Sequence, residues 1–236
     1  VLKFIDIFSF LFFNRKKYDV IHIQAHSGYN IITIIFSIFW ARLFNKKIVV
    51  MYYGGDAKSY FSKYPWFYKL IFKKVDIIVV ACNYMKSVFS SVLKIDTVII
   101  PHIINIEEWP TRLRTESRGN LLWVRSFWDD YNPLMLLKVY KKIIKNNPKI
   151  KLKIIGSGYL EKDIRDYIFN NKLIKVELLG RVSDKILKES YDWADIFINT
   201  TNIDNQPVTV LEAMICGCAI VTTNPGGIPD IIKHEY

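Results

Sequence analysis

The sequence predicts an α/β protein with parallel sheets, organised in two domains. Apolar, β-branched runs of strand length alternate with longer amphipathic stretches along nearly all of the 236 residues, as in strands joined by crossover helices. Residues 101–119 lose this alternation and gather charge, two prolines and a glycine, which is typical of an interdomain linker. We therefore expect a first domain at 1–108, a linker at 109–119 and a second domain at 120–236.

Residues 1–19 predict a helix at the start of the first domain. They are apolar and then basic, the reverse of the order in a secretory signal peptide. Residues 31–44 form the other long apolar run, but about 14 helical residues at ~1.5 Å each reach only ~21 Å, short of a ~30 Å hydrocarbon core. We expect strands at 18–24, 47–52, 76–81 and 97–100, and helices at 31–44, 60–74 and 83–93.

The alternation resumes after the linker. The expected strands lie at 120–124, 150–155, 174–179, 195–199 and 219–223, and the expected helices at 133–146, 160–170, 184–191 and 207–216, with a last helix starting at Pro229. Ligands of open parallel sheets bind beyond the carboxyl ends of the strands. The five loops that follow these strands should therefore meet at one edge of the sheet.

These five loops are made mostly of polar residues and glycines. Arg125 follows the first strand, the run 156–158 (Gly-Ser-Gly) follows the second, and 180–181, 200–206 and 224–227 follow the others. An arginine can hold phosphate oxygens with two hydrogen bonds, and glycines let the backbone approach a diphosphate closely. Each signal is weak alone, because a lone arginine is usually a solvated charge and a Gly-x-Gly run is usually a turn. Together they favour an anion site.

Two carboxylates lie in the segment 194–230. Glu212 is on a helix that starts at Pro207 and is otherwise apolar, and a buried carboxylate needs partners. The hydroxyls of a ribose would suit it, and a structural salt bridge is the alternative. Asp204 lies in the preceding loop, where contact with hydroxyls and an ordinary turn role are both open. The unpaired N–H groups and the dipole of the helix start favour a diphosphate.

In the first domain, His26 and the segment 52–57 lie at or just after predicted strands. Histidine titrates near neutrality, so His26 is a candidate acid or base. Tyr53, followed by Gly54, is a candidate hydrogen-bond donor on the acceptor side. A purely structural role is the alternative for these residues.

Composition and charge limit the partners. The net charge is +11, and residues 1–110 hold 14 basic and 7 acidic side chains, a net charge of +7. Basic charge spread over many helices without a nucleic-acid motif argues against nucleic-acid binding, whereas basic clusters beside apolar helices favour an anionic membrane surface. Cys82, Cys216 and Cys218 have the spacing of neither a zinc site nor a disulfide framework. We expect a cytoplasmic protein, peripheral on the inner membrane face, with no metal.

The chain resembles the retaining glycosyltransferases of family 4, which have the GT-B fold of two Rossmann-like domains facing a cleft. The resemblance is strongest from residue 120 to residue 230, through the motifs LLWVRSF, KLKIIGSG, KVELLGRVSD, YDWADIFINTT, DNQPVTVLEAMICGCAIVTT and NPGGIPD. The first half adds YDVIHIQ, KIVVMYYGGDA, DIIVVACNYMKSVF and VIIPHIIN. The comparison implies a fragment that lacks the opening strand and loop of the N-domain and the closing helices of the C-domain.

By this resemblance Glu212 would hold the ribose of a nucleotide sugar, Asp204 would contact the donor sugar, and Arg125 would neutralise the leaving diphosphate. The other donor contacts would come from Gly156, Gly158, Val182, Pro207, Val208, Gly226 and Gly227, with Tyr53 and Gly54 on the acceptor side. The implied reaction transfers a sugar, with retention, to a glycan or lipid-linked acceptor in cell-envelope polysaccharide synthesis. It needs no cofactor.

The chain departs from the family pattern at four places. The lysine that commonly follows the arginine is absent, the next lysine being Lys138. Tyr53 stands where a histidine is usual, His102 where an asparagine is usual, and Asp204 where a glutamate is usual. These departures keep a second interpretation open, in which the chain is a catalytically inactive nucleotide-sugar-binding or scaffolding protein.

Overall fold

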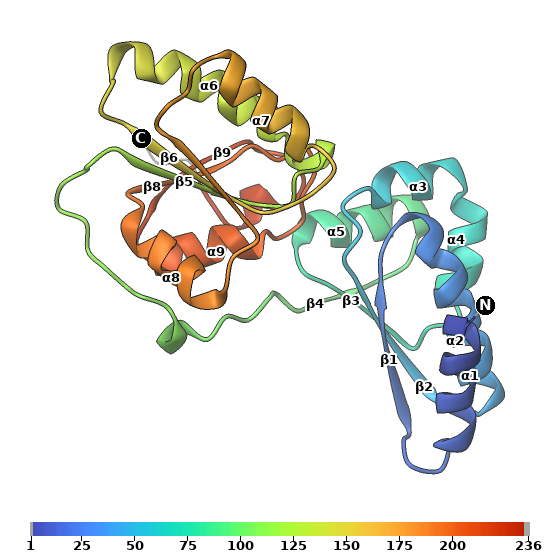
Figure 1. Ribbon diagram of the computed structural model, residues 1–236. Helices are drawn as coiled ribbons and strands as arrows, with labels where there is room; N and C mark the ends of the chain where they lie inside the picture. Colours follow the sequence, from blue (N-terminus) through green and yellow to red (C-terminus); the bar gives the residue numbers. More distant parts are fainter. Residues whose placement is uncertain (1, 234–236) are drawn as a thin grey trace. The chain divides into compact units, whose positions relative to one another are not determined.

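The computed structural model describes residues 2–233, which form two compact units (Figure 1). Unit 1 contains residues up to His102 together with the segment that starts at Gly226, and unit 2 contains Ile103–Pro225. All strand pairs in both units are parallel, so the predicted α/β class with parallel sheets is confirmed.

Unit 1 is a four-stranded sheet whose strands follow one another in chain order. The strands are β1 (Val20–Ala25), β2 (Lys47–Tyr52), β3 (Ile77–Val80) and β4 (Val98–Ile99). The helices are α1 (Leu2–Phe13), α2 (Ile31–Leu43), α3 (Ala57–Lys63), α4 (Pro65–Phe72) and α5 (Asn83–Val88), the last continued by a π-helical turn at Phe89–Leu93. Every crossover steps in the same direction, so right-handed connections place α2 to α5 on one face.

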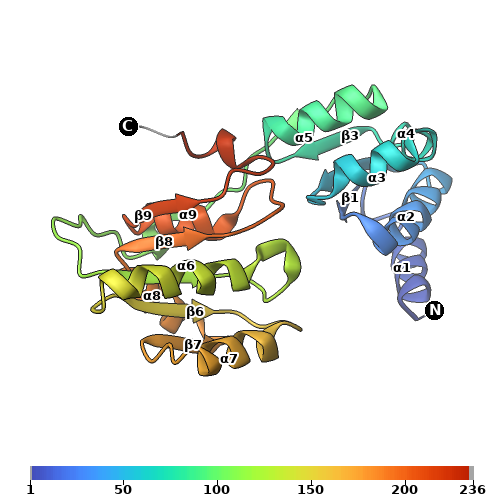
Figure 2. The same cartoon turned by 90° about the horizontal axis from the view of Figure 1, so that it is seen from above.

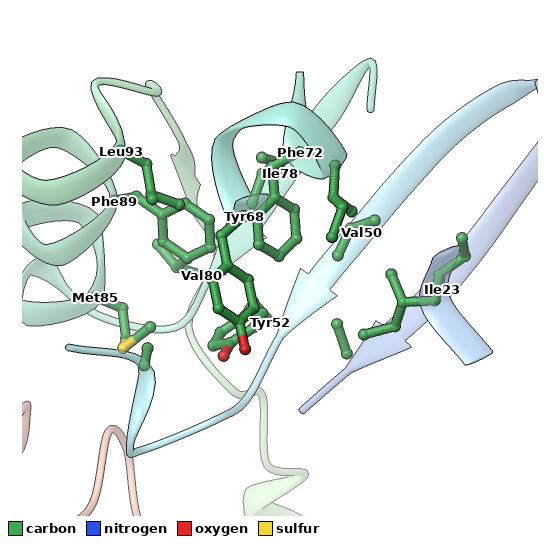
Figure 3. Packing of buried hydrophobic residues seen from close by; sticks show 14 of the residues in the cluster. Ile23, Val50, Tyr52, Tyr68, Phe72, Ile78, Val80, Met85, Phe89 and Leu93 are labelled. Atoms are coloured by element: carbon green, nitrogen blue, oxygen red, sulfur yellow. The ribbon is translucent and has the colours of Figure 1, made fainter. Parts of the chain in front are cut away.

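The core of unit 1 lies between that face and its helices. Ile23 and Val50 alternate with more exposed residues along β1 and β2, as period-two strands require, and they lie in one core with Val80 of the central strand β3, which is buried on both sides (Figure 3). The helices supply Tyr68 and Phe89 to the same cluster. The other face of β1 carries exposed polar side chains.

The helix expected at 60–74 is two helices in the structure. It is interrupted at Tyr64, whose backbone has φ −138° and ψ 60°, and α4 starts afresh at Pro65. Proline has no N–H and disfavours helical backbone at the residue before it, whereas it fits the first position of a helix. The break is a direct consequence of one residue.

Unit 2 is a five-stranded sheet in the order β7-β6-β5-β8-β9. The strands are β5 (Asn120–Val124), β6 (Lys151–Ile155), β7 (Val176–Gly180), β8 (Ile196–Asn199) and β9 (Ala219–Thr222); the helices are α6 (Pro133–Asn146), α7 (Glu161–Asn170), α8 (Asp184–Trp193) and α9 (Val208–Ile215). Helices α6 and α7 cover one face, and α8 and α9 cover the other (Figures 1 and 2). The winding direction therefore reverses between β5 and β8.

Unit 2 begins at Ile103, so it includes residues 103–108, which we expected in the first domain, and residues 109–119, which we expected as a linker; charged side chains bond the latter to its helices. The guanidinium of Arg114 donates to the carbonyl oxygens of Ala194 at 2.6 Å and Tyr191 at 2.8 Å, and also to that of Cys216. Asp195 accepts from the backbone N–H groups of Arg118 at 2.7 Å and Asn120 at 3.1 Å. These bonds tie the entry of β5 to the ends of α8 and α9.

The helix expected from Pro229 is a single 3-10 turn at Ile228–Asp230, and residues 234–236 of that expectation lie outside the described part of the chain. The carboxylate of Asp230 accepts a hydrogen bond from the N–H of Tyr84 at 3.2 Å, which ties this turn to the start of α5. Residues 226–233 thus group with unit 1, whereas we expected them in the second domain.

Within residues 2–233, no helix is long and apolar enough to cross a membrane. The longest apolar helix of unit 1, α2, has 13 residues, in agreement with the length argument made from the sequence.

Replacing Arg114 by Met should lower the free energy of unfolding by about 3 kcal/mol, because the backbone carbonyls that it satisfies would lose a charged donor. Urea unfolding monitored by circular dichroism measures the effect. Arg165→Met is the control, since among residues 2–233 Arg165 pairs only with Glu161 on the exposed face of α7, and such pairs contribute about 0.5 kcal/mol or less. Equal losses for the two variants would contradict the anchoring role.

Candidate functional site at the switch point of unit 2

Arg125 directly follows β5, the central strand, whose five residues are all buried. Its N–H donates to the carbonyl of Ile155 at 3.1 Å, which extends the β5–β6 ladder by one residue and fixes the backbone. The guanidinium lies over the ring of Tyr131, 4.8 Å from its centroid. Its Nε is buried and has no hydrogen-bond partner among the described residues. The structure therefore holds a positive charge just beyond the carboxyl end of β5, and the N–H at Nε remains able to donate a hydrogen bond.

Asp204 comes from the loop after β8 and forms an ion pair with Arg125. The two side chains are only 13% and 12% exposed. The second carboxylate oxygen accepts from the N–H of Asn205 at 2.9 Å. Because β5 and β8 are neighbours in the sheet, the loops that follow them meet where the winding reverses, the usual ligand site of such sheets.

Glu212 lies on α9 and accepts a hydrogen bond from the hydroxyl of Tyr191 at 2.7 Å. The alternative role expected for Glu212 was a structural salt bridge. No ion pair of Glu212 is found among the described residues, and its hydrogen-bond partner is a tyrosine hydroxyl. Burial raises the pKa of Glu212, while the Tyr191 hydrogen bond and the charge of Arg125 oppose that rise. The charge of Arg125 thus acts on Glu212, although the two side chains form no ion pair with each other.

The tyrosine that holds Glu212 is itself fully buried. Burial raises the pKa of Tyr191 well above its ordinary value, and the nearby carboxylate of Glu212 adds to the effect. The hydroxyl therefore stays protonated and acts as a donor. Trp109 packs edge-on against this ring, with centroids 5.5 Å apart.

The glycines after β6 are needed for loop packing. A Cβ at Gly156, which has φ +146°, would collide with the carbonyl oxygen of Arg125, and a Cβ at Gly158 would lie 2.5 Å from the carbonyl oxygen of Phe127. The N–H of Gly156 is bonded to the carbonyl of Gly180 at 2.9 Å. These glycines therefore let the β6–α7 loop support the backbone that carries Arg125, and contact with a donor stays a prediction.

Pro207 caps α9 instead of occupying its first helical position, so the helix begins at Val208. Pro207 is buried and Val208 is exposed at the helix start. The hydroxyl of Thr209, in the first turn, is buried and has no hydrogen-bond partner among residues 2–233. Val182 lies between β7 and α8 and is half-buried, next to the helix cap Ser183.

The acceptor-side candidates lie in unit 1 at the carboxyl ends of its strands. The ring of Tyr53 stacks between His26, at 5.4 Å, and His102, at 5.6 Å. A Cβ at Gly54 would be 2.7 Å from the N–H nitrogen of Ser27, so only glycine lets the loops after β1 and β2 come this close. Sequence reasoning noted His102 only as a departure from the family pattern, and the structure joins it to the other two rings.

Gly226 and Gly227 belong to unit 1 by their contacts, with Gly226 in a left-handed conformation at φ +60°. Their place beside the donor therefore stays a prediction. Tyr191 and Tyr131 were missed from the sequence, although the position of Tyr191 on the apolar side of α8 is a signal that a buried hydroxyl needs a partner. In the described part of the chain no cluster of three or more His, Cys, Asp or Glu residues could hold a metal.

The fold and the site define an α/β protein of two Rossmann-like units, with a largely buried arginine–aspartate ion pair beyond the carboxyl ends of two neighbouring strands of unit 2. The chain belongs to the family described as glycosyl transferases group 1, whose model matches residues 105–236. This confirms the family that the motifs indicated.

Curated relatives and solved structures agree with this assignment. The chain is 27% identical to the UDP-Gal:alpha-D-GlcNAc-diphosphoundecaprenol alpha-1,3-galactosyltransferase of Escherichia coli, over 94% of this chain and 62% of that one. It is 26% identical to the GPI3 subunit of the phosphatidylinositol N-acetylglucosaminyltransferase of Saccharomyces cerevisiae, over 58% of this chain and 32% of that one. The chain thus spans less than two thirds of each relative.

Among solved structures, TarM matches with a TM-score of 0.79 at 13% identity, over 95% of this chain and 46% of that one. Sucrose-phosphate synthase from Thermosynechococcus elongatus matches with a TM-score of 0.77 at 17% identity, over 94% of this chain and 60% of that one. At these identities the matches show the fold, which is GT-B as expected.

Replacing Glu212 by Gln should raise the melting temperature of the ligand-free protein at neutral pH, since burial disfavours the charged carboxylate. With its folded pKa above the ordinary 4.5, wild type loses stability relative to the variant as pH rises from 4.5 through the raised value. Below 4.5 the difference should be smallest. Thermal melts across this pH range measure it, with exposed Glu189→Gln as control. A variant less stable than wild type at neutral pH would contradict the assignment.

Proposed function

We propose that the protein is a glycosyltransferase that uses a nucleotide-sugar donor. The observation that carries the proposal is the cluster of Arg125, Asp204 and Glu212 at the switch point of unit 2. Arg125 Nε and the Thr209 hydroxyl are buried without partners among the described residues, and buried polar groups normally have them. A ligand with phosphate oxygens and hydroxyls would satisfy both kinds of group.

In this proposal each charged side chain has one task. Arg125 stabilises the negative charge that builds up on the leaving diphosphate, aided by the low exposure of its site. Glu212, held by Tyr191, uses its other oxygen to accept from the ribose hydroxyls. Asp204 accepts from hydroxyls of the donor sugar after exchanging its ion pair with Arg125 for them. We propose that transfer proceeds with retention, mainly through positioning and electrostatic stabilisation of an oxocarbenium-like sugar.

We propose a glycan or lipid-linked acceptor and a role in cell-envelope polysaccharide synthesis at an anionic membrane surface on the cytoplasmic side. The names of two relatives support the acceptor class, since they refer to a diphosphoundecaprenol and to phosphatidylinositol. On the protein side, the stacked rings of His26, Tyr53 and His102 offer the acceptor a polar aromatic surface at the strand edge of unit 1. His26, which is exposed, is the proposed acid or base there.

A catalytically inactive nucleotide-sugar-binding protein is the second candidate. The observation that favours it is the ion pair of Arg125 with Asp204. Because these two groups already neutralise each other, a donor must break their ion pair before it can bind to either. The absence of a lysine soon after Arg125 points the same way. Donor binding without turnover would distinguish this candidate from the enzyme.

UDP, GDP or ADP should raise the melting temperature of the full-length protein. A ligand at 100 times its dissociation constant stabilises the folded state by ~2.7 kcal/mol, and a thermal-shift panel of the three nucleotides measures the effect. Glu212→Ala should abolish most of the shift, because the ribose loses its acceptor. Glu189→Ala, on the exposed side of α8, is the matched control. If no nucleotide shifts the melting temperature, the donor-site assignment is wrong.

Arg125→Lys should lower kcat by about 100- to 1,000-fold, because a lysine lacks the planar fork that holds two phosphate oxygens. Sugar transfer from the donor identified by the nucleotide panel measures kcat. Arg165→Lys, on the exposed face of α7, should retain wild-type turnover. Wild-type kcat in Arg125→Lys would remove Arg125 from the reaction, and donor binding by a wild-type protein that transfers no sugar would favour the inactive candidate.

A further inference from the structure

Helix α2 is apolar on two sides. Its buried stripe, with Ile34 and Ile38, packs on the sheet of unit 1. A second stripe points to solvent, and Phe39 and Leu43 on it are each 59% exposed. A helix that is apolar all round is normally buried, so the outer stripe of α2 calls for a partner.

Helix α4 lies beside α2 and repeats the pattern (Figure 1). Tyr68 and Phe72 are buried in the core, while Trp66 and Leu70, four residues apart and therefore on one side, are 70% and 57% exposed. Of these two residues, Leu70 lines the same pocket as Phe39 and Leu43 of α2.

Between α2 and α4 runs a groove of about 370 Å³. Apolar side chains of both helices line it, with Phe39, Leu43 and Leu70 among them. Its volume falls in the range of sites for small apolar ligands. The groove thus has the shape of a receptor for a hydrocarbon group.

The charged residues that line the groove are both basic, Arg42 and Lys74. Arg42 forms an ion pair with Asp76 at 3.1 Å, and that carboxylate also pairs with Lys47 at 3.4 Å, so two cations share one anion. Lys73 and Lys74 have exposed side chains. Residues 31–76 hold eight basic and two acidic residues in all. The surroundings of the groove therefore suit an anionic partner with an apolar part.

We propose that the groove between α2 and α4 seats a hydrocarbon chain of an anionic phospholipid bilayer, with the lipid phosphates at Arg42, Lys73 and Lys74. Apolar contact plus several basic residues is the combination that holds a peripheral protein on an anionic leaflet. The inference deepens the membrane part of the proposed function and rests on it, but its test reads lipid binding and not sugar transfer.

The topology favours bilayer lipid over the acceptor lipid as the occupant. Helices in a parallel sheet run opposite to the strands, so the last turns of α2 and α4 lie at the amino ends of the strands. Arg42 shows this directly, since its ion-pair partner Asp76 immediately precedes β3. His26 and Tyr53 lie at the carboxyl ends. An acceptor whose diphosphate was held at the basic end would therefore carry its sugar at the edge opposite these rings.

Vesicle flotation with the full-length protein tests the proposal. Wild type should bind vesicles of phosphatidylcholine mixed with phosphatidylglycerol more strongly than phosphatidylcholine alone, and high salt should weaken this binding. The double variant Leu43→Gln, Leu70→Gln should bind about tenfold more weakly or worse, because both side chains lose their apolar contact. Lys73→Gln with Lys74→Gln should weaken binding about 30-fold and reduce the salt dependence.

Matched controls separate the groove from general stickiness. Phe169→Gln with Ile174→Gln removes two apolar side chains of unit 2 that are even more exposed than Leu43 and Leu70, and Lys141→Gln with Lys142→Gln removes an adjacent lysine pair from α6. Both controls should bind vesicles like wild type. Circular dichroism and melting temperature confirm that each variant is folded.

Three results would overturn the proposal: no binding of wild type to anionic vesicles, wild-type binding by the groove variant, or equal losses in the controls. Intact vesicle binding with a raised KM for a lipid-linked acceptor in the groove variant would assign the groove to the acceptor instead. Nucleotide-induced stabilisation, measured on the same variants, should be unchanged. If it is absent from wild type while vesicle binding follows expectation, the proposed transferase function fails and the groove assignment stands.

Discussion

The parallel pairing of β5 with β8 is the constraint on which the candidate site depends. These strands are far apart in sequence, with β6 and β7 between them in the chain, yet they are hydrogen-bonded neighbours in the sheet. The chain continues from β5 to one side of the sheet and from β8 to the other, so the two loops begin side by side at the switch point, where ligands of such sheets bind. Arg125 and Asp204 come from those two loops and meet there. The Arg114 and Asp195 bonds support this pairing by fixing the chain just before each strand.

The charged groups of the site already have partners in the ligand-free protein, and these partners lower the cost of burying them. An arginine with little exposure is costly to leave unpaired, and Asp204 reduces that cost in the ligand-free protein. Glu212 does not join the ion pair; burial raises its pKa, and the hydroxyl of Tyr191 donates a hydrogen bond to it. The proposed donor brings negative charge to Arg125 and hydroxyls to both carboxylates, so Arg125 and Asp204 would exchange each other for the donor, while Glu212 would keep Tyr191 and add the ribose. The binding energy gained is therefore the difference between two sets of partners.

The sequence predicted most elements because their periodicities are local. The apolar run of β5 indicates a strand that is buried on both sides. Pro207 indicated where the next helix starts, and Glu212 stood out as a carboxylate on an otherwise apolar helix. Strand order was beyond the sequence, since nothing local states that β8 pairs with β5. Tyr191 was missed as the partner of Glu212 for the same reason: the two residues lie on different helices, and only the packing of α8 beside α9 joins them. By contrast, the break at Pro65 was readable from one residue and was overlooked.

The apolar sequence of helix α2 accounts for two features of the structure, its packing on the core and its exposed apolar stripe. Its apolar run is too short to span a bilayer and too apolar for an ordinary surface helix, and the structure resolves this by giving one stripe to the core and leaving the other beside α4. The core stripe sets the position of the helix on the sheet, so the outer stripe and Arg42 are placed by packing that would exist without any lipid. The ring stack at the opposite strand edge rests on the same sheet. Lipid contact and acceptor contact would therefore use the two ends of one sheet, so we expect that either can be altered by mutation without disturbing the other.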